Sequence, residues 1–162
     1  MTKKIVHKVL TENDIFDVKL FCIECKILGY DNNSSLEKIK WNTAKWIGTY
    51  IDDVLISMSG VRPEPDIEEK AYRILFRGVT LPGHTIKSTK DITKTSVQWQ
   101  HIPYQIELVN DINANFYMTS NVNFGVKSHR LTKYMKNCND VLFYKKMKLF
   151  GVEQIVWKYK NN

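Results

Sequence analysis

The sequence has few of the features that mark membrane, secreted and metal-binding proteins. Among 162 residues there are three cysteines, seven glycines and four prolines, and the apolar runs are only a few residues long. A helix needs about 20 mostly apolar residues to span a bilayer, so no membrane segment is expected. The N-terminus also lacks the apolar core and small-residue cleavage site of a signal peptide, and we therefore expect a soluble, cytoplasmic protein.

The three cysteines, Cys22, Cys25 and Cys138, are too few and too unevenly placed for a disulfide framework. Cys22 and Cys25 have the spacing of zinc and redox motifs, but no second Cys/His pair follows at a matching distance. They also fall inside an expected helix, whereas a redox pair would occupy its first turn. We expect them to be buried as small apolar side chains, with no metal and no disulfide.

Several catalytic signatures are missing as well. The chain contains no Walker loop, no nucleophile elbow, no His-Glu-x-x-His helix and no paired-carboxylate site. Any chemistry therefore has to be inferred from the order of the secondary-structure elements and from the residues at their ends.

Arginine is scarce in an otherwise basic chain. The net charge of +7 comes from 24 basic and 17 acidic residues, but only four of the basic residues are arginines. A positive excess attracts polyanions such as nucleic acid or a phosphate-rich cofactor, while direct base readout usually depends on arginine forks. The basic segments 87–94, 127–136 and 144–148 leave two interpretations open, a nucleic-acid-binding face or a solvated lysine surface.

Apolar and aromatic residues are plentiful enough for a folded core. They make up 43% and 12% of the chain, and 162 residues suit one compact domain covering residues 1–162. Periodicity predicts strands at 4–10, 45–51, 54–61, 71–79, 115–122, 141–152 and 153–160. It predicts helices at 11–29, 34–42, 103–114 and 126–137.

Local signals support several of these elements. The stretch from Thr11 to Asp14 resembles a capping box, and Gly29 is a plausible helix stop. The apolar stripe expected to face the core of this first helix consists of Phe16, Leu20, Ile23 and Ile27. Ser34 and Glu37 form a second capping box, with Leu36 and Ile39 as the buried positions. Asp52-Asp53 predicts a hairpin turn, because Asp tolerates positive φ angles.

This order of elements resembles the GNAT fold of the Gcn5-related N-acetyltransferases, over most of the chain. Residues 79–82 (VTLP) look like the end of that family's central strand, residues 119–121 (TSN) sit where the next parallel strand ends, and residues 131–137 (LTKYMKN) are similar to the helix that carries the family's tyrosine. The resemblance implies an α+β (α/β) fold: a single GNAT-like domain whose mixed, mostly antiparallel sheet of about seven strands is flanked by about four helices.

The resemblance also implies a co-substrate, acetyl-CoA or another acyl-CoA, lying between two parallel strands that splay apart. Free ladder groups would bond its pantetheine arm, and a helix N-terminus would face its pyrophosphate. The family's Gln/Arg-x-x-Gly-x-Gly/Ala loop is absent, and residues 83–94 read GHTIKSTKDITK instead. The residues then expected to bind the cofactor are Val79, Thr80, Leu81, Gly83, Lys87, Ser88, Thr89 and Asn121.

Two residues are the expected catalytic groups for acyl transfer to an amine. Tyr134 would protonate the departing thiolate, and His84, with an ordinary pKa near about 6.5, would accept the proton of the amine. The backbone N–H of Leu81 or a neighbour would polarise the thioester carbonyl. Tyr134 also fits a half-buried helix aromatic, and His84 a solvated loop residue.

Two functions from different classes therefore remain open. One is an acyl-CoA-dependent N-acyltransferase, which transfers the acyl group to an amine acceptor that the sequence does not identify. The other is a non-catalytic binding or structural protein on the same scaffold, which contacts nucleic acid or a protein through its basic face. Nothing in the sequence indicates the oligomeric state.

Overall fold

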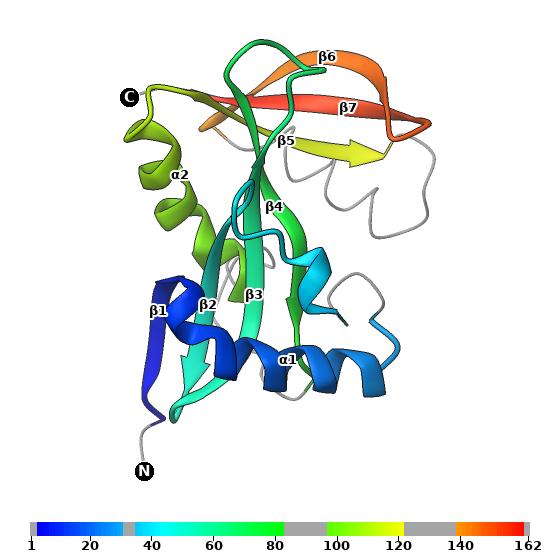
Figure 1. Cartoon of the computed structure of the whole chain (residues 1–162). Coiled ribbons are helices and arrows are strands. Elements are labelled where there is room, and N and C mark those ends of the chain that lie inside the picture. Colours follow the sequence, from blue (N-terminus) through cyan, green and yellow to red (C-terminus); the bar gives the residue numbers. More distant parts are fainter. Residues whose placement is uncertain (1–2, 31–34, 83–96, 122–138, 161–162) are drawn as a thin grey trace. The chain divides into compact units, whose positions relative to one another are not determined.

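The computed structural model describes residues 3–30, 35–82, 97–121 and 139–160 (Figure 1). Their strands are β1 (Ile5–Leu10), β2 (Lys45–Ile51), β3 (Val54–Pro63), β4 (Ala71–Thr80), β5 (Asn115–Asn121), β6 (Val141–Leu149) and β7 (Val152–Tyr159). Their helices are α1 (Ile15–Ile27) and α2 (Ile102–Asn110), with 3-10 turns η1 (Glu12–Asp14), η3 (Leu36–Lys38) and η4 (Val97–His101).

The strands form one mixed sheet in the order β1-β2-β3-β4-β5-β7-β6. β1 with β2, β2 with β3, β5 with β7 and β6 with β7 are antiparallel, and β4 with β5 is parallel. The expected α+β class with about seven mostly antiparallel strands is confirmed. The expectation of about four helices is not matched in the described residues, which contain two α-helices.

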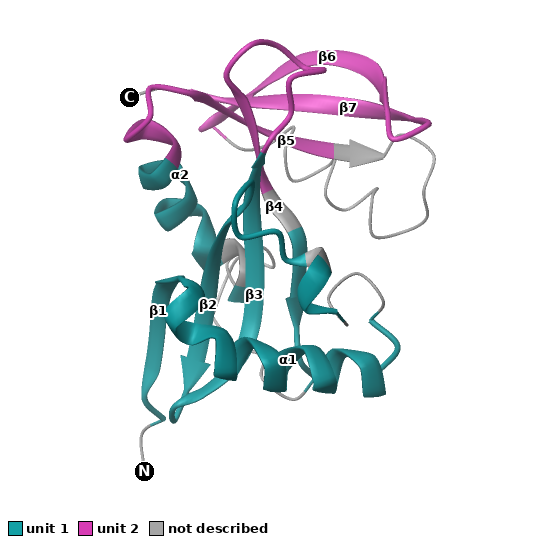
Figure 2. Ribbon diagram, in the orientation of Figure 1, with its two compact units in different colours: residues 1–62, 75–108 teal, residues 63–74, 109–162 magenta. Residues whose placement is uncertain are grey.

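The chain divides into two compact units, which Figure 2 distinguishes by colour. Unit 1 comprises residues 1–62 and 75–108, and unit 2 comprises residues 63–74 and 109–162. β4 and α2 each contribute residues to both units. The single domain over residues 1–162 stays a prediction.

Two tight turns join neighbouring strands with the backbone geometry that hairpins require. Between β2 and β3, Asp52 and Asp53 have φ angles of 48° and 67°, and between β6 and β7, Phe150 and Gly151 have φ angles of 56° and 75°. Two consecutive positive φ values match the twist of the flanking strands. The hairpin expected at Asp52-Asp53 is confirmed, and the last two predicted strands are joined at Phe150-Gly151.

The start and the end of the first helix agree with the sequence. Thr11 accepts a hydrogen bond from the Asn13 N–H, and Asp14 accepts one from the Thr11 N–H, which completes the expected capping box ahead of α1. Gly29 follows the helix with φ of 76°, and the Tyr30 N–H donates to the Cys25 carbonyl. A left-handed glycine here is a common C-terminal cap.

Our prediction of which face of α1 is buried is wrong. Figure 1 shows α1 crossing the strands of unit 1, and the side chains that it buries against them are Val18, Phe21, Cys22 and Cys25. The four residues of the expected stripe are 51–72% exposed. Both faces of the helix are apolar, so periodicity alone does not determine which one packs on the sheet.

The two cysteines of α1 are buried and free, as expected. Cys25 is fully buried and Cys22 is 4% exposed, among the core residues Phe21, Trp46 and Met58. Burial, with smaller contributions from Cys22 and Glu24, raises the pKa of the Cys25 thiol to about 12, and burial also raises the pKa of Cys22. Both therefore behave as small apolar side chains.

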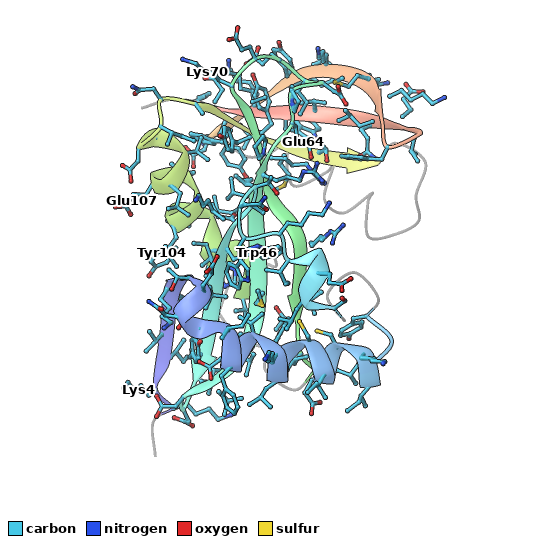
Figure 3. The ribbon with its side chains drawn as sticks, in the orientation of Figure 1. Lys4, Trp46, Glu64, Lys70, Tyr104 and Glu107 are labelled. Carbon is cyan, nitrogen blue, oxygen red and sulfur yellow. The ribbon has the colours of Figure 1, made fainter. Side chains whose placement is uncertain are left out.

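The second expected helix is wrong in length. In the described part of the helix predicted over residues 34–42, the structure has a single 3-10 turn, η3, and Lys40, two residues after it, has φ of 54°. The Trp46 indole N–H donates to the Ile39 carbonyl over 2.8 Å, which removes an acceptor that a continuing helix would need (Trp46 is labelled in Figure 3). Ile39 is nevertheless fully buried, as predicted.

The remaining elements agree with the sequence where they are described. α2 begins one residue before the predicted start at Pro103 and buries Gln105 and Val109, while Ile112 lies beyond it and is 52% exposed. The core of unit 2 contains Ile67, Ala71, Tyr117, Leu149 and Val156. The predicted helix over residues 126–137 lies outside the described residues. No helix in the described ranges is long and apolar enough to cross a membrane.

Candidate functional site

The described part of the expected cofactor site is the end of β4. Val79, Thr80 and Leu81 lie there, and all three are half-buried. The backbone of Asn121 pairs opposite Gln154 at the end of β5, in unit 2. The other expected site residues fall outside the described residues, and they are Gly83, His84, Lys87, Ser88, Thr89 and Tyr134.

Ser57 on β3 fixes the end of β4. Its buried hydroxyl lies 2.9 Å from the Val79 carbonyl, to which it donates, and 2.8 Å from Thr80 Oγ1. The Leu81 N–H donates to the Ile56 carbonyl over 2.9 Å. The main-chain groups of Val79 and Leu81 are therefore directed toward β3, and the Leu81 N–H is already used within unit 1.

Gly78 and Thr80, the two neighbours of Val79 in the chain, direct their main-chain groups to the other edge of β4. Successive residues of a strand alternate between the two edges, so Gly78 and Thr80 face away from β3 if Val79 and Leu81 face toward it. A strand edge that presents N–H and C=O groups can bond an extended ligand. The sequence assigned the N–H that would polarise the thioester carbonyl to Leu81 or a neighbour. The structure narrows that choice to Gly78 and Thr80.

The backbone of β4 departs from regular strand geometry just before these residues. Arg77 has φ of 49°, in the left-handed region that L-residues other than Asn and Asp seldom adopt. One such residue inside a strand marks a bulge, which redirects the following main-chain groups and often occurs beside functional sites. Gly78 follows at once and places no side chain near this edge.

A buried polar cluster lies on one face of β2 and β3, in unit 1. His101 in η4 contacts Thr49 Oγ1 through Nε2 and Ser59 Oγ through Nδ1, both at 2.6 Å. His7 on β1 contacts the same Thr49 oxygen at 2.7 Å and Gln100 Oε1 at 2.9 Å. We call His7, Thr49, Ser59, Gln100, His101 and Gln105 the His101 cluster.

The hydrogen bonds of the His101 cluster can all run in one direction. Gln105 Nε2 donates to Ser59 Oγ over 3.1 Å, which leaves the Ser59 proton for His101 Nδ1. His101 Nε2–H then donates to Thr49, and Thr49 donates to His7. His7 Nε2–H donates to Gln100 Oε1. Both imidazoles and both hydroxyls are satisfied while the two imidazoles stay neutral, and Gln105 Oε1 is left buried without a hydrogen-bond partner among the described residues.

Burial keeps His101 neutral. Burial, with a smaller contribution from the charge of a protonated His7, lowers the pKa of His101 to about 3. Burial lowers the pKa of His7 as well, and its hydrogen bond to Gln100 opposes the shift only in part. The cluster therefore joins β1, β2, β3, η4 and α2 without any formal charge.

Sequence reasoning missed the His101 cluster. Its members come from five elements, and the polar side chains of Thr49, Ser59 and Gln105 occupy positions that an amphipathic pattern reserves for apolar residues. The available signal was the alternation of Ser57 and Ser59 with apolar residues in β3, which places both hydroxyls on one face.

Unit 2 has its own polar centre at Glu68. This carboxylate accepts hydrogen bonds from the hydroxyls of Tyr117 and Tyr144 and from Asn115 Nδ2, and Lys158 Nζ lies 3.8 Å away. Hydrogen bonding by Tyr117 is the main cause that lowers the pKa of Glu68. We call these five residues the Glu68 cluster. It braces β5, β6 and β7 against residues 67–68.

A shallow pocket of about 430 Å³ in unit 1 is lined by Lys40, Asn42, Thr43, Ala44 and Arg62. Two of the five lining residues, Lys40 and Arg62, are cationic. No group of three or more His, Cys, Asp or Glu side chains in the described ranges is placed to hold a metal ion.

Comparison with known proteins gives structural neighbours and no sequence relatives. No family model matches the sequence, and no curated protein matches it. Among solved structures, a putative GNAT-family acetyltransferase from Desulfovibrio desulfuricans is similar, with a TM-score of 0.61 at 10% identity, over 97% of this chain and 99% of that one.

Two further neighbours were solved with ligands. The PaiA N-acetyltransferase of Thermoplasma acidophilum, in complex with coenzyme A, has a TM-score of 0.57 at 13% identity, over 97% of this chain and 99% of that one. Arabidopsis thaliana Naa50, in complex with the bisubstrate analogue CoA-Ac-MVNAL, has a TM-score of 0.52 at 12% identity, over the same shares. The chain has the GNAT fold, which confirms the resemblance on which the sequence analysis relied.

Proposed function

We propose that this protein is an acyl-CoA-dependent N-acyltransferase, which moves an acyl group, most simply acetyl, from CoA to an amine. The observation that carries the proposal is the end of β4. There Arg77 has a left-handed backbone conformation within β4, and the Leu81 N–H donates to Ile56 of β3. Strand alternation then directs the main-chain groups of Gly78 and Thr80 away from β3. The neighbours solved with coenzyme A and with a CoA bisubstrate analogue support acyl-CoA as the co-substrate.

In the proposed reaction the amine attacks the thioester carbonyl carbon directly. A C–N bond forms, the C–S bond breaks, the amine loses a proton, and the departing thiolate gains one. A backbone N–H of Gly78 or Thr80 stabilises the oxyanion, because a donor fixed at a strand edge needs no reorganisation during the reaction. Tyr134 as the acid and His84 as the base remain our predictions for the two proton transfers.

The phosphate end of the ligand is assigned to residues after β4. In the proposal Gly83, Ser88 and Thr89 offer backbone and hydroxyl donors, and Lys87 offers charge. Asn121 at the end of β5 would bond the pantetheine arm. In the proposal the amine acceptor is the second substrate. The reaction would take place in the cytoplasm.

Calorimetric titration with acetyl-CoA and with CoA tests the proposal most directly. We expect saturable binding of both, and turnover with amine acceptors once one is found. Absence of binding at millimolar ligand overturns the proposal. Salt-sensitive retention of RNA or DNA in the same preparation would then favour the binding-protein alternative.

A pair of variants at Thr80 tests the strand-edge donor. Thr80→Pro removes the backbone N–H at an edge position that proline tolerates, and it should weaken acetyl-CoA binding about tenfold, in line with one lost hydrogen bond. Thr80→Val keeps the N–H and loses only the side-chain bond to Ser57. Equal affinity in both variants, with folding confirmed by circular dichroism, would assign the donor elsewhere.

Tyr134→Phe tests the proposed acid. It should lower kcat roughly 100-fold and leave CoA affinity unchanged, because the hydroxyl acts on the leaving thiolate alone. Tyr144→Phe serves as the matched control, since Tyr144 belongs to the Glu68 cluster and should leave kcat unchanged. Steady-state kinetics and calorimetry on the same preparations separate the two effects.

A further inference from the structure

The outward face of α1 is an uncovered apolar stripe. Phe16, Leu20, Ile23 and Ile27 are 69%, 51%, 56% and 72% exposed, and we call these four residues the outer stripe. They follow one another at steps of four, three and four residues, which is the spacing of the seam of a coiled coil. The opposite face of the helix already packs into unit 1, so the helix cannot bury the outer stripe by rotating.

Charges of opposite sign border the outer stripe. Asp17 and Glu24 lie along one side of it, and Lys19 and Lys26 lie along the other. Lys19, Glu24 and Lys26 are exposed, while Asp17 is half-buried and accepts a hydrogen bond from the Tyr50 hydroxyl. In heptad terms the acidic residues occupy the e positions and the lysines the g positions.

We infer that the outer stripe of α1 packs against α1 of a second copy of this chain, with the two helices parallel. In a parallel pair the g side of one helix meets the e side of the other, so Lys19 of each copy faces Glu24 of its partner. A two-fold axis along the helices produces this contact twice. An antiparallel pair would instead bring lysine to lysine and carboxylate to carboxylate.

The size of the stripe sets the strength of the association. A helix of 13 residues is about 20 Å long and offers four apolar side chains per copy, which is less than a standard stable interface. The pair should therefore form and dissociate with protein concentration. The inference uses neither β4 nor acyl-CoA, so it is independent of the proposed function.

Sedimentation equilibrium over a wide concentration series tests the contact. The unmodified protein should show a monomer–dimer equilibrium, and Ile23→Lys should weaken it at least tenfold. Val54→Lys is the matched control, because Val54 is also exposed in unit 1, at 59%, but lies in the β2–β3 hairpin. A protein that stays monomeric throughout, or a dimer that Ile23→Lys leaves intact, overturns the inference.

Charge exchange tests the parallel direction. Lys19→Glu alone and Glu24→Lys alone should each weaken the dimer, whereas a mixture of the two variants should associate better than either one. Neither position has a charged residue three or four positions away, so the isolated helix is little affected. Stronger association of Lys19→Glu alone would indicate antiparallel helices and overturn the assignment.

Discussion

The two units bury polar groups in opposite ways. The His101 cluster in unit 1 is neutral throughout, and its hydrogen bonds link two imidazoles, two hydroxyls and two side-chain amides. Unit 2 holds charges instead. Glu68 is a carboxylate ringed by tyrosines, and Glu64, only 3% exposed, pairs with Arg73 Nε over 3.0 Å.

The difference shows how the available partners set the charge state of a buried group. An imidazole among hydroxyls and amides gains nothing from protonation, and burial then favours its neutral form. A carboxylate that receives tyrosine and guanidinium hydrogen bonds is stabilised in its charged form. The units should therefore respond differently to substitution and to pH.

The largest effect should come from breaking the buried ion pair of unit 2. Arg73→Met leaves Glu64 buried without its charged partner, and we expect a loss of about 3–5 kcal/mol in the free energy of unfolding. Arg73→Met combined with Glu64→Leu should recover most of that loss, because no unpaired charge remains. Urea unfolding of both variants measures the difference, and equal losses would show that the charge is not the cause.

The pH response should separate the two clusters. The pKa of His101 is about 3 in the folded chain and near its ordinary value of 6.5 when unfolded, so the unfolded chain binds the proton first. Stability is then complete above about pH 6.5 and falls as pH is lowered toward 3. Between pH 7 and pH 5 the loss should be about 2 kcal/mol.

His101→Gln removes this titration, and chemical unfolding at the two pH values should show a much smaller difference in that variant. The Glu68 cluster contributes at lower pH. The pKa of Glu68 lies below its ordinary value of 4.5, so its contribution is present above that pH and is lost only as pH falls further. An unchanged pH dependence in His101→Gln would refute the assignment to His101.

A smaller effect should follow from neutralising the Glu68 cluster. Glu68→Gln keeps the shape of the side chain but loses charge-assisted bonds to Tyr117 and Tyr144, and we expect about 1 kcal/mol of destabilisation. Glu68 is partly exposed, which limits the loss. Glu69→Gln at the exposed neighbouring position is the control and should be neutral in thermal unfolding.

The smallest effect should come from Asp53 in the β2–β3 turn, and Gly151 in the β6–β7 turn should respond in the opposite direction. Asp53→Gly relieves a left-handed aspartate and should raise the free energy of unfolding by a few tenths of a kcal/mol. Gly151→Ala should lower it by about 1 kcal/mol, because its φ is 75° although a Cβ would meet no atom within 4 Å. Thermal unfolding measures both variants. Changes of the same sign in the two unfolding temperatures would contradict the turn geometry that the two hairpins share.

The positions of the strands along the chain were predictable because their signals are local. Alternating patterns, the Asp52-Asp53 turn and Gly151 each act within a few residues, and the structure follows them. The buried face of α1 was not predictable, because apolar residues lie on both sides and only the tertiary contact decides between them. The 3-10 turn at Leu36–Lys38 depends on Trp46, ten residues later in the chain from Leu36.

The candidate site was predictable only at the end of β4. Val79 to Leu81 were placed by the strand pattern, while the choice between Leu81 and its neighbours required the bond from Leu81 to Ile56. The His101 cluster brings together Thr49, Ser59 and His101 across 52 residues of sequence, and periodicity carries no information about such pairings.

The two cysteines of α1 can also report local unfolding of this helix. A thiol reacts with alkylating reagents as the thiolate, and both exclusion from solvent and a raised pKa suppress that form in Cys22 and Cys25. Modification must wait until α1 leaves the strands that it covers. The rate of alkylation at these two positions, followed by mass spectrometry, then measures the rate of that separation without any engineered label.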